Sequence, residues 1–422
     1  MAIAVTPPRG MRDFLPADKA VRERSLGIIR ESFRAHGFDE IETPVMEDSI
    51  RLHSGLGGDN EKLAFAVLKR GLSAADVAAA AAQDDLLSLA DLGLRFDLTV
   101  PLARFYATHR AALPSVFRSI QIAPVWRAER PQKGRFRQFM QCDIDIIGEA
   151  GPLAEIELIT ATAAALDKLG LTGCSIRIND RRILTTLLAH WGVAAELTER
   201  ALIVIDKLDK IGVDGVATEL GTLGIDAPDL ATLLTELGTG GWALGADAPG
   251  GSVPDWLDPV AFGDLEALRA ALPGVELWFD PTLVRGMGYY TGTIFEISHP
   301  DLAYSLGGGG RYDGMIGRFL GTDVPACGFS IGFERIVDLL QADAASALNA
   351  VVLVHEKDAD PARLVALKRD LVEEGLRVRL ERRTKNLKAL LDRAGEAGYG
   401  RFAFVTNDTN TAADLDFKPL GA

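Results

Sequence analysis

The sequence predicts a protein of the α+β class that ends in a smaller α/β domain, and three observations support this prediction. Residues 127–148 alternate charged and apolar side chains with the period of a strand on either side of a turn, which indicates a β-hairpin. Residues 180–275 show mostly helical patterns. After residue 335, strand and helix patterns alternate, which is typical of a parallel sheet with covering helices.

Length and composition limit the possible classes of protein. A chain of 422 residues can hold two or three domains, each with its own core. The formal net charge of −14 argues against a polycation that coats nucleic acid, so any nucleic-acid contact needs local basic patches. We expect neither a membrane span nor a signal peptide, because the sequence has no run of about 18 apolar residues and no apolar N-terminal core.

The cysteine pattern favours a cytoplasmic protein with reduced thiols. Cys142, Cys174 and Cys327 lie far apart and form no CxxC pair, and their odd number suits free thiols. We expect no metal or disulfide role for them. Cys142 is predicted to be a small buried residue on the apolar face of its strand.

The N-terminal part of the chain is predicted to form a helix, a strand and an insertion. Apolar residues recur at helical spacing over residues 26–33. Apolar and acidic residues then alternate over residues 40–45, which predicts a strand, and Pro44 places it at an edge or in an interrupted ladder. Residues 61–93 are expected to be a peripheral insertion whose alanine-rich part, residues 74–82, favours a helix.

The hairpin of residues 127–148 has one polar face and one apolar face. Arg137, Phe139, Gln141, Asp143 and Asp145 share one face, and Met140, Cys142, Ile144 and Ile146 share the other. The strand before the turn is expected to carry Arg127 and Glu129 on a common face. Alternation alone fits a solvated face equally well. Arginine, however, binds phosphate oxygens through two parallel hydrogen bonds, so the two arms favour convergence on one ligand.

The elements beyond the hairpin follow from the same patterns. A helix is predicted at residues 153–170, a strand at 174–178 and a helical subdomain at 180–275; strands follow at 351–354, 376–380 and 402–405, with helices at 361–374 and 386–398. The last part contains a basic cluster of Arg377, Arg379, Arg382, Arg383, Lys385 and Lys388. This cluster is either a solvated face or an RNA-binding surface. Residues 406–422 are polar, and we expect the last elements of that domain to be reduced.

Several sequence blocks resemble those of class II aminoacyl-tRNA synthetases. Arg-Pro-Gln-Lys-Gly-Arg-Phe-Arg-Gln-Phe at residues 130–139 resembles motif 2 in the version found in histidyl-tRNA synthetases. The blocks RFDLTVP (95–101), LVRGMGYYTGT (283–293), and GGGGRYDG (307–314) with GFSIGFER (328–335) resemble the family's amino-acid-binding segment, its histidine signature and the region leading into motif 3. The helix and strand around Pro44 resemble motif 1, the dimer-forming element. The resemblance covers nearly the whole chain.

The resemblance implies both an architecture and an activity. An antiparallel class II catalytic core would comprise residues 1–180 (motifs 1 and 2) and 276–340 (histidine signature and motif 3), with a helical insertion at 181–275 and an anticodon-binding domain at 345–422. The implied activity converts L-histidine and ATP to histidyl-adenylate and pyrophosphate, and then transfers histidine to the 3′ end of the tRNA specific for histidine. Also implied are Mg²⁺ on the ATP phosphates, no tightly bound protein metal, no membrane partner, and a cytoplasmic homodimer.

The resemblance further implies roles for individual residues. The expected catalytic residues are Arg285, Arg127 and Arg335, and the expected ATP-binding residues are Arg127, Glu129, Arg137 and Arg335. The expected histidine-binding residues are Asp97, Leu98, Thr99, Gln141, Asp145, Tyr289 and Tyr290. The expected tRNA-binding residues are Gln132, Arg135, Arg382, Arg383 and Lys385. Asp97 and Thr99 would lie on one strand face and receive the α-amino group, and Asp145 would face the imidazole.

Two glycine positions bear on this comparison. The run at residues 307–310 is not a Walker loop, because no Gly-Lys-Ser/Thr follows it, and we expect it to let substrate approach a strand closely. Gly288 stands where the family's signature usually has aspartate, which loosens the surroundings of Arg285 unless a neighbour compensates.

Other interpretations remain open at this point. Arg285 could cap carbonyl groups at a strand end, and the two tyrosines could be core aromatics. A paralogue that keeps the synthetase core could regulate the first enzyme of histidine biosynthesis, although such proteins typically lack the anticodon-binding domain. A nucleic-acid-binding module without catalysis would leave the ATP-binding set unexplained.

Overall fold

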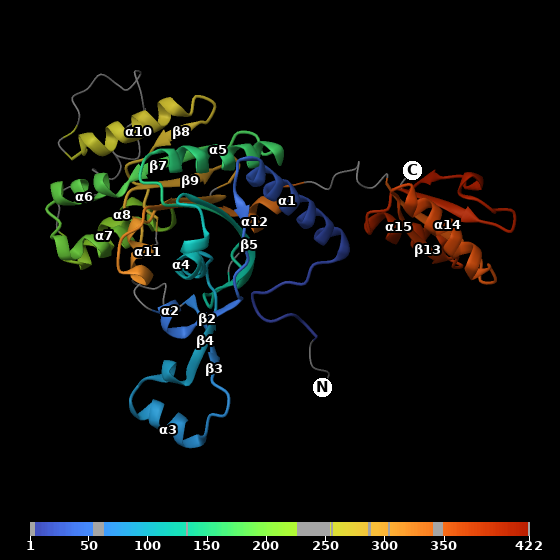
Figure 1. The fold of residues 1–422 in the computed structure, drawn as a ribbon, viewed down its shortest axis with the longest axis horizontal. Coiled ribbons are helices and arrows are strands. Elements are labelled where there is room, and N and C mark those ends of the chain that lie inside the picture. Colours follow the sequence, from blue (N-terminus) through green and yellow to red (C-terminus); the bar gives the residue numbers. More distant parts are fainter. Residues whose placement is uncertain are drawn as a thin grey trace. The chain divides into compact units, whose positions relative to one another are not determined.

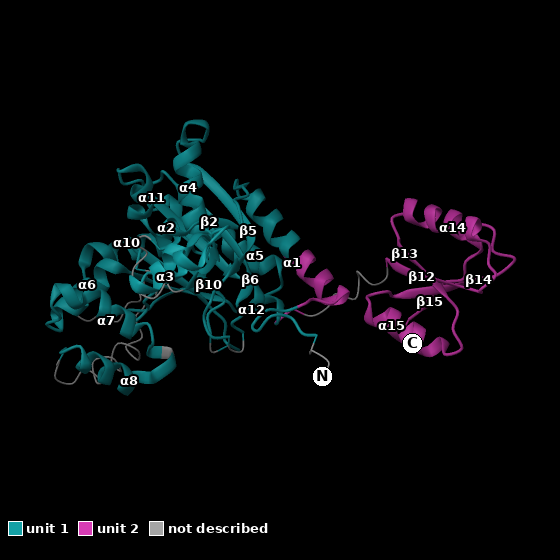
Figure 2. Cartoon of the chain, turned by 90° about the horizontal axis from the view of Figure 1, so that it is seen from below, with its two compact units in different colours: residues 1–12, 26–338 teal, residues 13–25, 339–422 magenta. Residues whose placement is uncertain are grey.

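The computed structural model describes residues 5–53, 63–131, 134–225, 254, 256–285, 288–302, 304–340 and 349–420. The chain divides into two compact units: residues 1–12 with 26–338, and residues 13–25 with 339–422 (Figure 2). None of the described helices is long and apolar enough to cross a membrane.

An eight-stranded sheet organises the first unit. Its strand order is β1-β5-β6-β11-β10-β9-β7-β8. The strands are β1 (Asp39–Glu40), β5 (Phe117–Trp126), β6 (Gln138–Ile147), β7 (Ser175–Asp180), β8 (Leu277–Phe279), β9 (Thr293–Ser298), β10 (Gly307–Arg311) and β11 (Ala326–Gly332). All neighbours are antiparallel except the edge pairs β1–β5 and β7–β8. This arrangement confirms the α+β class and an antiparallel core.

Pairing in the middle of this sheet brings the polar face of the hairpin beside glycine-rich strands. On β6 and β11, Asp143 is opposite Ser330 and Asp145 is opposite Gly328. A β-carbon at position 328 would collide with Asp145 Oδ1, so the carboxyl group occupies the space that a side chain would need. The sequence separation of these two strands explains why local patterns could not predict this neighbour.

Helices cover the apolar face of the same strands. Helix α5 (Leu153–Lys168) packs against β6 and β11 (Figure 1), and Cys142, Ile144 and Ile146 on β6 are fully buried. The remaining helices of this part are α1 (Pro16–Ala35), α4 (Thr99–His109), η3 (Arg110–Ala112), α11 (Asp313–Leu320) and α12 (Phe333–Val337). The faces of β6 therefore alternate as the sequence predicts.

The predicted helical block is present after β7. It consists of α6 (Arg181–His190), η4 (Ala195–Leu197), α7 (Thr198–Ile205), α8 (Leu208–Thr222) and α10 (Pro259–Ala271). Residues 226–253 of this block lie outside the described residues. Leu187, Leu202 and Leu220 belong to the same buried cluster as Leu102 and Tyr290. The insertion thus packs on the core through a continuous apolar contact.

The strand predicted at residues 40–45 is wrong as a single element. β1 ends at Glu40, and the chain resumes a strand only at β2 (Met46–Asp48), which pairs in a different sheet with β4 (Ala90–Leu94). The Arg95 guanidinium donates to the carbonyl oxygens of Thr43 and Pro44. A distant side chain therefore takes the carbonyls that a strand partner would use, and Pro44 has no N–H to offer.

A small sheet of β2, β4 and β3 (Phe65–Leu68) carries the peripheral insertion. The predicted helix at residues 74–82 is α3 (Ala74–Ala82), and Ser73 and Asp76 form a capping box at its start. The other short helices here are α2 (Ser49–His53) and η2 (Leu86–Leu89).

The C-terminal part of the second unit confirms the predicted alternation. Its elements are β12 (Ala350–His355), α14 (Pro361–Glu373), β13 (Arg377–Arg382), α15 (Leu387–Glu396), β14 (Arg401–Val405), η5 (Ala412–Asp414) and β15 (Lys418–Pro419). The sheet order is β13-β12-β14-β15, with the first three strands parallel and β15 antiparallel. One apolar cluster forms under α14 and another under α15, so the sheet is covered on both faces. Within the described residues after β14, which end at residue 420, the elements are η5 and the two-residue β15.

Candidate active site

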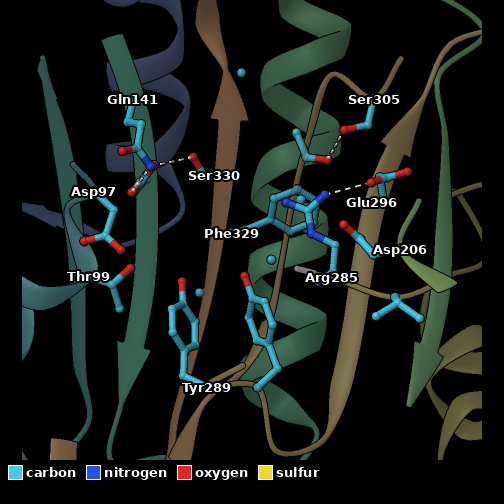
Figure 3. A pocket seen from close by; sticks show the side chains of 18 of the residues that line it. Asp97, Thr99, Gln141, Asp206, Arg285, Tyr289, Glu296, Ser305, Phe329 and Ser330 are labelled. Carbon is cyan, nitrogen blue, oxygen red and sulfur yellow. Dashed lines mark hydrogen bonds and ion pairs between the residues drawn. The ribbon is translucent and has the colours of Figure 1, made fainter. Parts of the chain in front are cut away.

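A cavity of about 860 Å³ opens over the polar face of β6 and its neighbours β11, β10 and β9. Figure 3 shows Asp97, Thr99 and Gln141 on one side of this cavity and Arg285 and Glu296 on the other. Of the predicted site residues, those that line it are Asp97, Thr99, Arg127, Glu129, Arg135, Gln141, Asp145, Arg285, Tyr289, Tyr290 and Arg335. Residues of the helical insertion, including Asp206 on the α7–α8 connection, form part of the wall.

Buried oxygen atoms dominate one side of the cavity. Gln141 Nε2 donates to Asp143 Oδ2 (3.2 Å), which fixes the amide group beside the carboxyl group. Among the described residues, Asp97 Oδ2, Gln141 Oε1 and Asp143 Oδ1 are buried and accept no hydrogen bond. Because an unpaired buried oxygen costs free energy, three together indicate a place for a donor-rich, positively charged group.

Burial raises the pKa values of the three acids in this region. It raises the pKa of Asp97, although the Val100 amide and Arg127 act in the opposite direction. Burial and the neighbouring Asp145 raise the pKa of Asp143 well above its ordinary value. Burial raises the pKa of Asp145 to about 7, although a hydrogen bond from Tyr312 opposes the shift. A cation bound here would favour the charged forms.

Asp97 and Thr99 do not lie on a strand, contrary to the prediction. β4 ends at Leu94, and Thr99 is the first residue of α4. Asp97 Oδ1 accepts a hydrogen bond from the backbone N–H of Val100 (3.3 Å), and Pro101 occupies the first helical turn, where its missing N–H costs nothing. Both polar side chains therefore reach the cavity from a helix start.

Leu98 lies behind this helix start and not in the cavity wall. It is fully buried, and its carbonyl oxygen accepts a hydrogen bond from Gln121 Nε2 (3.0 Å) on β5. That bond ties the segment carrying Asp97 and Thr99 to the central sheet.

Three tyrosines form the floor near Asp145. The rings of Tyr289 and Tyr290 lie 4.8 Å apart, and the Tyr312 ring meets Tyr289 edge-on at 5.9 Å. Tyr312 Oη donates to Asp145 Oδ1 (2.6 Å). Burial raises the pKa of all three phenols, so they remain neutral hydrogen-bonding groups.

Arginines line the cavity from several elements. Arg127 follows the end of β5; its Nε donates to the Phe96 carbonyl (3.0 Å), and its guanidinium lies 4.9 Å from the Phe139 ring centroid. Arg335, on α12, donates to the Ser305 carbonyl. Burial lowers the pKa of both arginines, but an arginine keeps its charge at neutral pH.

Arg285 reaches the cavity from the connection between β8 and β9. Its Nη1 donates to Glu296 Oε2 at 2.7 Å. Burial alone would lower the pKa of Arg285, but Glu296 outweighs that effect and raises it. The interpretation of Arg285 as a strand-end cap does not fit its location, since residues 283–285 belong to no helix or strand and the guanidinium pairs with the carboxylate of Glu296.

The hairpin connection differs from its predicted form. β5 ends at Trp126 and β6 begins at Gln138, so Arg127, Glu129 and Arg137 lie outside both strands. Arg137 is absent from the cavity wall, because its guanidinium donates to the carbonyls of Glu129 and Ala128. Glu129 and Arg135 form an ion pair (3.1 Å) at the wall. Gln132 lies outside the described residues.

Known proteins are similar to this chain over its first unit and, for some relatives, over its whole length. A family profile described as histidyl-tRNA synthetase matches residues 10–336. The chain belongs to the histidyl-tRNA synthetase family. The histidine–tRNA ligase of Leifsonia xyli subsp. xyli is 64% identical over 429 aligned residues, which cover 100% of this chain and 99% of the relative.

Solved structures agree with this membership. The crystal structure of histidyl-tRNA synthetase from Nostoc sp. superposes with a TM-score of 0.75 at 25% identity, covering 99% of this chain and 95% of that one. A Bacillus halodurans structure described as an ATP phosphoribosyltransferase regulatory subunit/histidyl-tRNA synthetase has a TM-score of 0.71 at 21% identity, with 96% and 98% covered. The second likeness shows the shared fold alone.

The basic cluster predicted from the sequence lies in the second unit of the chain. Arg377 and Arg379, on β13, each have their guanidinium 4.6 Å from the Tyr399 ring centroid. Arg383 pairs with Glu356 (2.8 Å). The other members, Arg382, Lys385 and Lys388, are exposed. The cluster is thus partly neutralised and partly open to solvent.

The cavity residues that were given no role from the sequence include Asp143, Tyr312, Ser330 and Glu296. Alternation had placed Asp143 on the polar face of β6, and Tyr312 lies within a recognised block, so both had a local signal. Ser330 also lies within a recognised block, but Glu296 had no local signal, because it comes near Arg285 only through the reversal of the chain.

Proposed function

We propose that this chain is a histidine–tRNA ligase that activates L-histidine with ATP to form histidyl-adenylate and pyrophosphate, and then transfers histidine to the 3′ end of its tRNA. The observation that carries the site assignment is the polarity of the cavity: unpaired buried oxygens on one side, Arg285 on the other, and further arginines in the wall. An amino acid has the complementary polarity, because its ammonium group donates and its carboxylate accepts.

Histidine would lie across the sheet between these two sides. Its α-ammonium group has three N–H donors for Asp97, Thr99 and Gln141, and Asp143 holds the Gln141 amide in place. Asp145 would face the imidazole, supported by Tyr312, while Tyr289 and Tyr290 complete the pocket. A site with such dedicated polar partners rejects analogues that lack the matching groups, since its own groups would remain unsatisfied.

ATP would lie where the arginines converge. Arg127 would hold the α-phosphate, Arg335 the γ-phosphate, and Glu129 would orient the nucleotide. The histidine carboxylate oxygen attacks the α-phosphorus in line, a new C–O–P link forms, and pyrophosphate leaves with the electron pair of the broken P–O bond. Arg285 would stabilise the charge that builds on the phosphoryl oxygens, which is the main task in phosphoryl chemistry.

Mg²⁺ fits this site as an ion carried by the nucleotide. No cluster of three His, Cys, Asp or Glu that could hold a metal occurs within the part of the chain that the structure describes. Mg²⁺ commonly binds through substrate phosphates and only one or two carboxylates, and Glu129 and Glu334 lie in the cavity wall. When bound, the ion would neutralise charge on the leaving pyrophosphate.

The other units of the chain would serve the tRNA and the assembly. Residues 1–180 and 276–340 would form the catalytic core, residues 181–275 an insertion near the tRNA acceptor end, and residues 345–422 the anticodon-binding domain. Arg135, Arg382, Arg383 and Lys385 supply positive charge for RNA phosphates. The protein would act as a cytoplasmic homodimer. A role as a regulator of histidine biosynthesis is not favoured, because the relative of 64% identity over the whole chain is a histidine–tRNA ligase.

Pyrophosphate exchange with all twenty standard amino acids tests the activity. We expect the purified chain to exchange pyrophosphate into ATP with histidine and with no other amino acid. An Asp97→Asn variant should lose most of this exchange, because a neutral amide attracts the ammonium group less strongly. Exchange with a different amino acid, or none with any, would contradict the proposal.

A further inference from the structure

A chain of alternating charges runs along one end of the sheet to Arg285. Arg177 Nε donates to Asp280 Oδ2 (2.7 Å), Arg177 Nη1 lies 3.2 Å from Glu296 Oε1, and Glu296 Oε2 accepts from Arg285 Nη1 (2.7 Å). These groups come from neighbouring strands, since Arg177 on β7 is paired with Glu296 on β9 and Asp280 directly follows β8. Each oxygen of Glu296 thus holds a different arginine.

The strand next to β9 completes a seat for the guanidinium. Gly308 on β10 is directly opposite Glu296. A β-carbon at position 308 would lie 2.8 Å from Arg285 Cζ, so the guanidinium rests against bare backbone. Glu296 fixes this group from the side and Gly308 from below.

Arg285 needs such a seat because of its location. Its backbone belongs to no helix or strand, and its side chain has several rotatable bonds. Gly288, close by in the chain, offers no side chain. Glu296 is the carboxylate that raises the pKa of Arg285 most, and Asp206 contributes less.

We propose that Glu296 is a positioning residue for the activation step, which acts by holding the Arg285 guanidinium against Gly308. Glu296 itself would touch no reacting atom. The inference rests on the proposed function, because it needs Arg285 to act on the reacting carboxylate and phosphate. It also identifies the neighbour that compensates for glycine at position 288.

The test combines Glu296→Gln with Arg285→Lys. Glu296→Gln keeps the shape of the side chain but removes its charge, so single-turnover adenylate formation should slow by roughly tenfold or more while the KM for histidine changes little. In the Arg285→Lys background, the same change should cause little further loss, because residues that act as a unit are not additive. A purely structural role would give independent losses.

A matched control removes a similar ion pair elsewhere. Glu157 on α5 pairs with Arg118 on β5 (2.5 Å) outside the cavity. Glu157→Gln should leave the rate of adenylate formation unchanged, whatever its effect on melting temperature. If Glu296→Gln does not fold, Glu296→Asp replaces it: the shorter side chain should give a rate between those of the wild type and Arg285→Lys.

The outcomes separate this inference from the proposed function. Wild-type rates in the Glu296 variants, or additive losses with Arg285→Lys, would overturn the positioning role alone. Absence of histidine-dependent exchange in the unmodified chain would overturn the proposed function, and the positioning role with it.

Discussion

Asp143 and Asp145 lie on the same strand, and burial is the largest cause of the pKa shift of each. Burial raises the pKa of Asp145 to about 7, and burial together with the charge of Asp145 raises the pKa of Asp143 well above its ordinary value. Tyr312 donates to Asp145 and lowers its pKa in part. Asp145 therefore changes charge near neutral pH, and burial also favours the protonated form of Asp143.

Asp145→Asn should change how stability depends on pH. Between pH 3.8 and about pH 7, the folded chain holds a proton on Asp145 that the unfolded chain has released. The stability that this proton contributes is present at low pH and is lost as pH rises through the folded pKa, by up to about 1.4 kcal/mol per pH unit. Asparagine does not titrate, so the melting temperature of the variant relative to wild type should rise from about pH 5 to about pH 7 and level off at higher pH.

Melting at one fixed protein concentration measures this difference. Asp91→Asn is the control, since Asp91 is an exposed acid on β4. A difference between Asp145→Asn and wild type that stays constant over this range would contradict the raised pKa.

Arg285→Lys should slow histidyl-adenylate formation on the order of 10² or more, because a point charge cannot reproduce the planar fork of the guanidinium. Histidine and ATP binding should suffer less, since an interaction made mainly in the transition state lowers kcat. Single-turnover rates and melting temperatures, measured in parallel, decide the matter. A lower melting temperature with an unchanged rate would make Arg285 a structural partner of Glu296.

Individual residues were predictable where the signal was local. The period of a strand was enough to place Gln141, Asp143 and Asp145 on one face of β6. Strand alternation failed for Arg137, because the strand begins one residue later and backbone carbonyls hold its guanidinium. Glu296 gave no signal in the sequence, since its role depends on its contacts with Arg177 and Arg285, which only the fold brings together.

At the scale of elements, β10 is a strand almost without side chains. Its glycines let the Arg285 guanidinium and the Tyr290 ring lie directly on the backbone. The close approach of substrate to this glycine run stays a prediction: Gly307, Gly308 and Gly309 line the cavity, and two side chains of the cavity wall rest on the same strand. The run therefore shapes the site through the residues that rest on it.

Gly308→Ala should displace the Arg285 guanidinium and slow adenylate formation at least tenfold, roughly the effect of misplacing a reacting group. The new methyl group would also meet the Phe295 carbonyl oxygen, so some loss of stability is expected. Gly263→Ala, on α10 with nothing within 4 Å of its β-carbon, should keep full activity and gain about 0.5–1 kcal/mol. Full activity in Gly308→Ala would show that the close approach is unimportant.

The order of elements was largely predictable, but their pairing was not. Helices at residues 74–82 and 361–374 followed from composition and periodicity. The interrupted strand at residues 40–45 did not, because Arg95 competes for its carbonyls from fifty residues away. Periodicity sees neighbours along the chain, whereas such a competitor acts through space.

At the scale of the whole molecule, the two units carry different chemistry. The cavity lies within the first unit, and the basic cluster lies within residues 377–388 of the second. The sheet of the second unit has its own apolar clusters on both faces. The two steps of the proposed reaction should therefore respond separately to changes in the two units.

Deleting residues from about 345 onward should leave residual histidine activation but strongly reduce tRNA charging. The arginines and acids of the cavity all precede that point, whereas the basic cluster follows it. Pyrophosphate exchange and aminoacylation, measured on the same preparation, separate the two steps. Unchanged charging with unchanged salt dependence would make the basic cluster a solvated face.

Charge reversal tests the same surface in the full chain. Arg382→Glu with Lys385→Glu should weaken tRNA binding and reduce its dependence on salt, because fewer counterions are released. Arg369→Glu with Lys418→Glu makes the same charge change on α14 and on β15, the opposite edge of the sheet from β13. Equal weakening by both pairs would indicate attraction by net charge and no specific surface.

The adjacency of β6 and β11 also has a consequence for synthesis. One edge of β6 pairs with β5 directly before it, but the other waits for residues 326–332. A ribosome needs on the order of 10–40 s to add the intervening residues at about 5–20 residues per second. During that interval a nascent chain carries an open strand edge with Ile144 and Ile146 uncovered on their β11 side. Chains released before Ala326 is added would be prone to aggregate through this open edge. Translation pauses within the helical insertion should therefore lower the yield of folded protein.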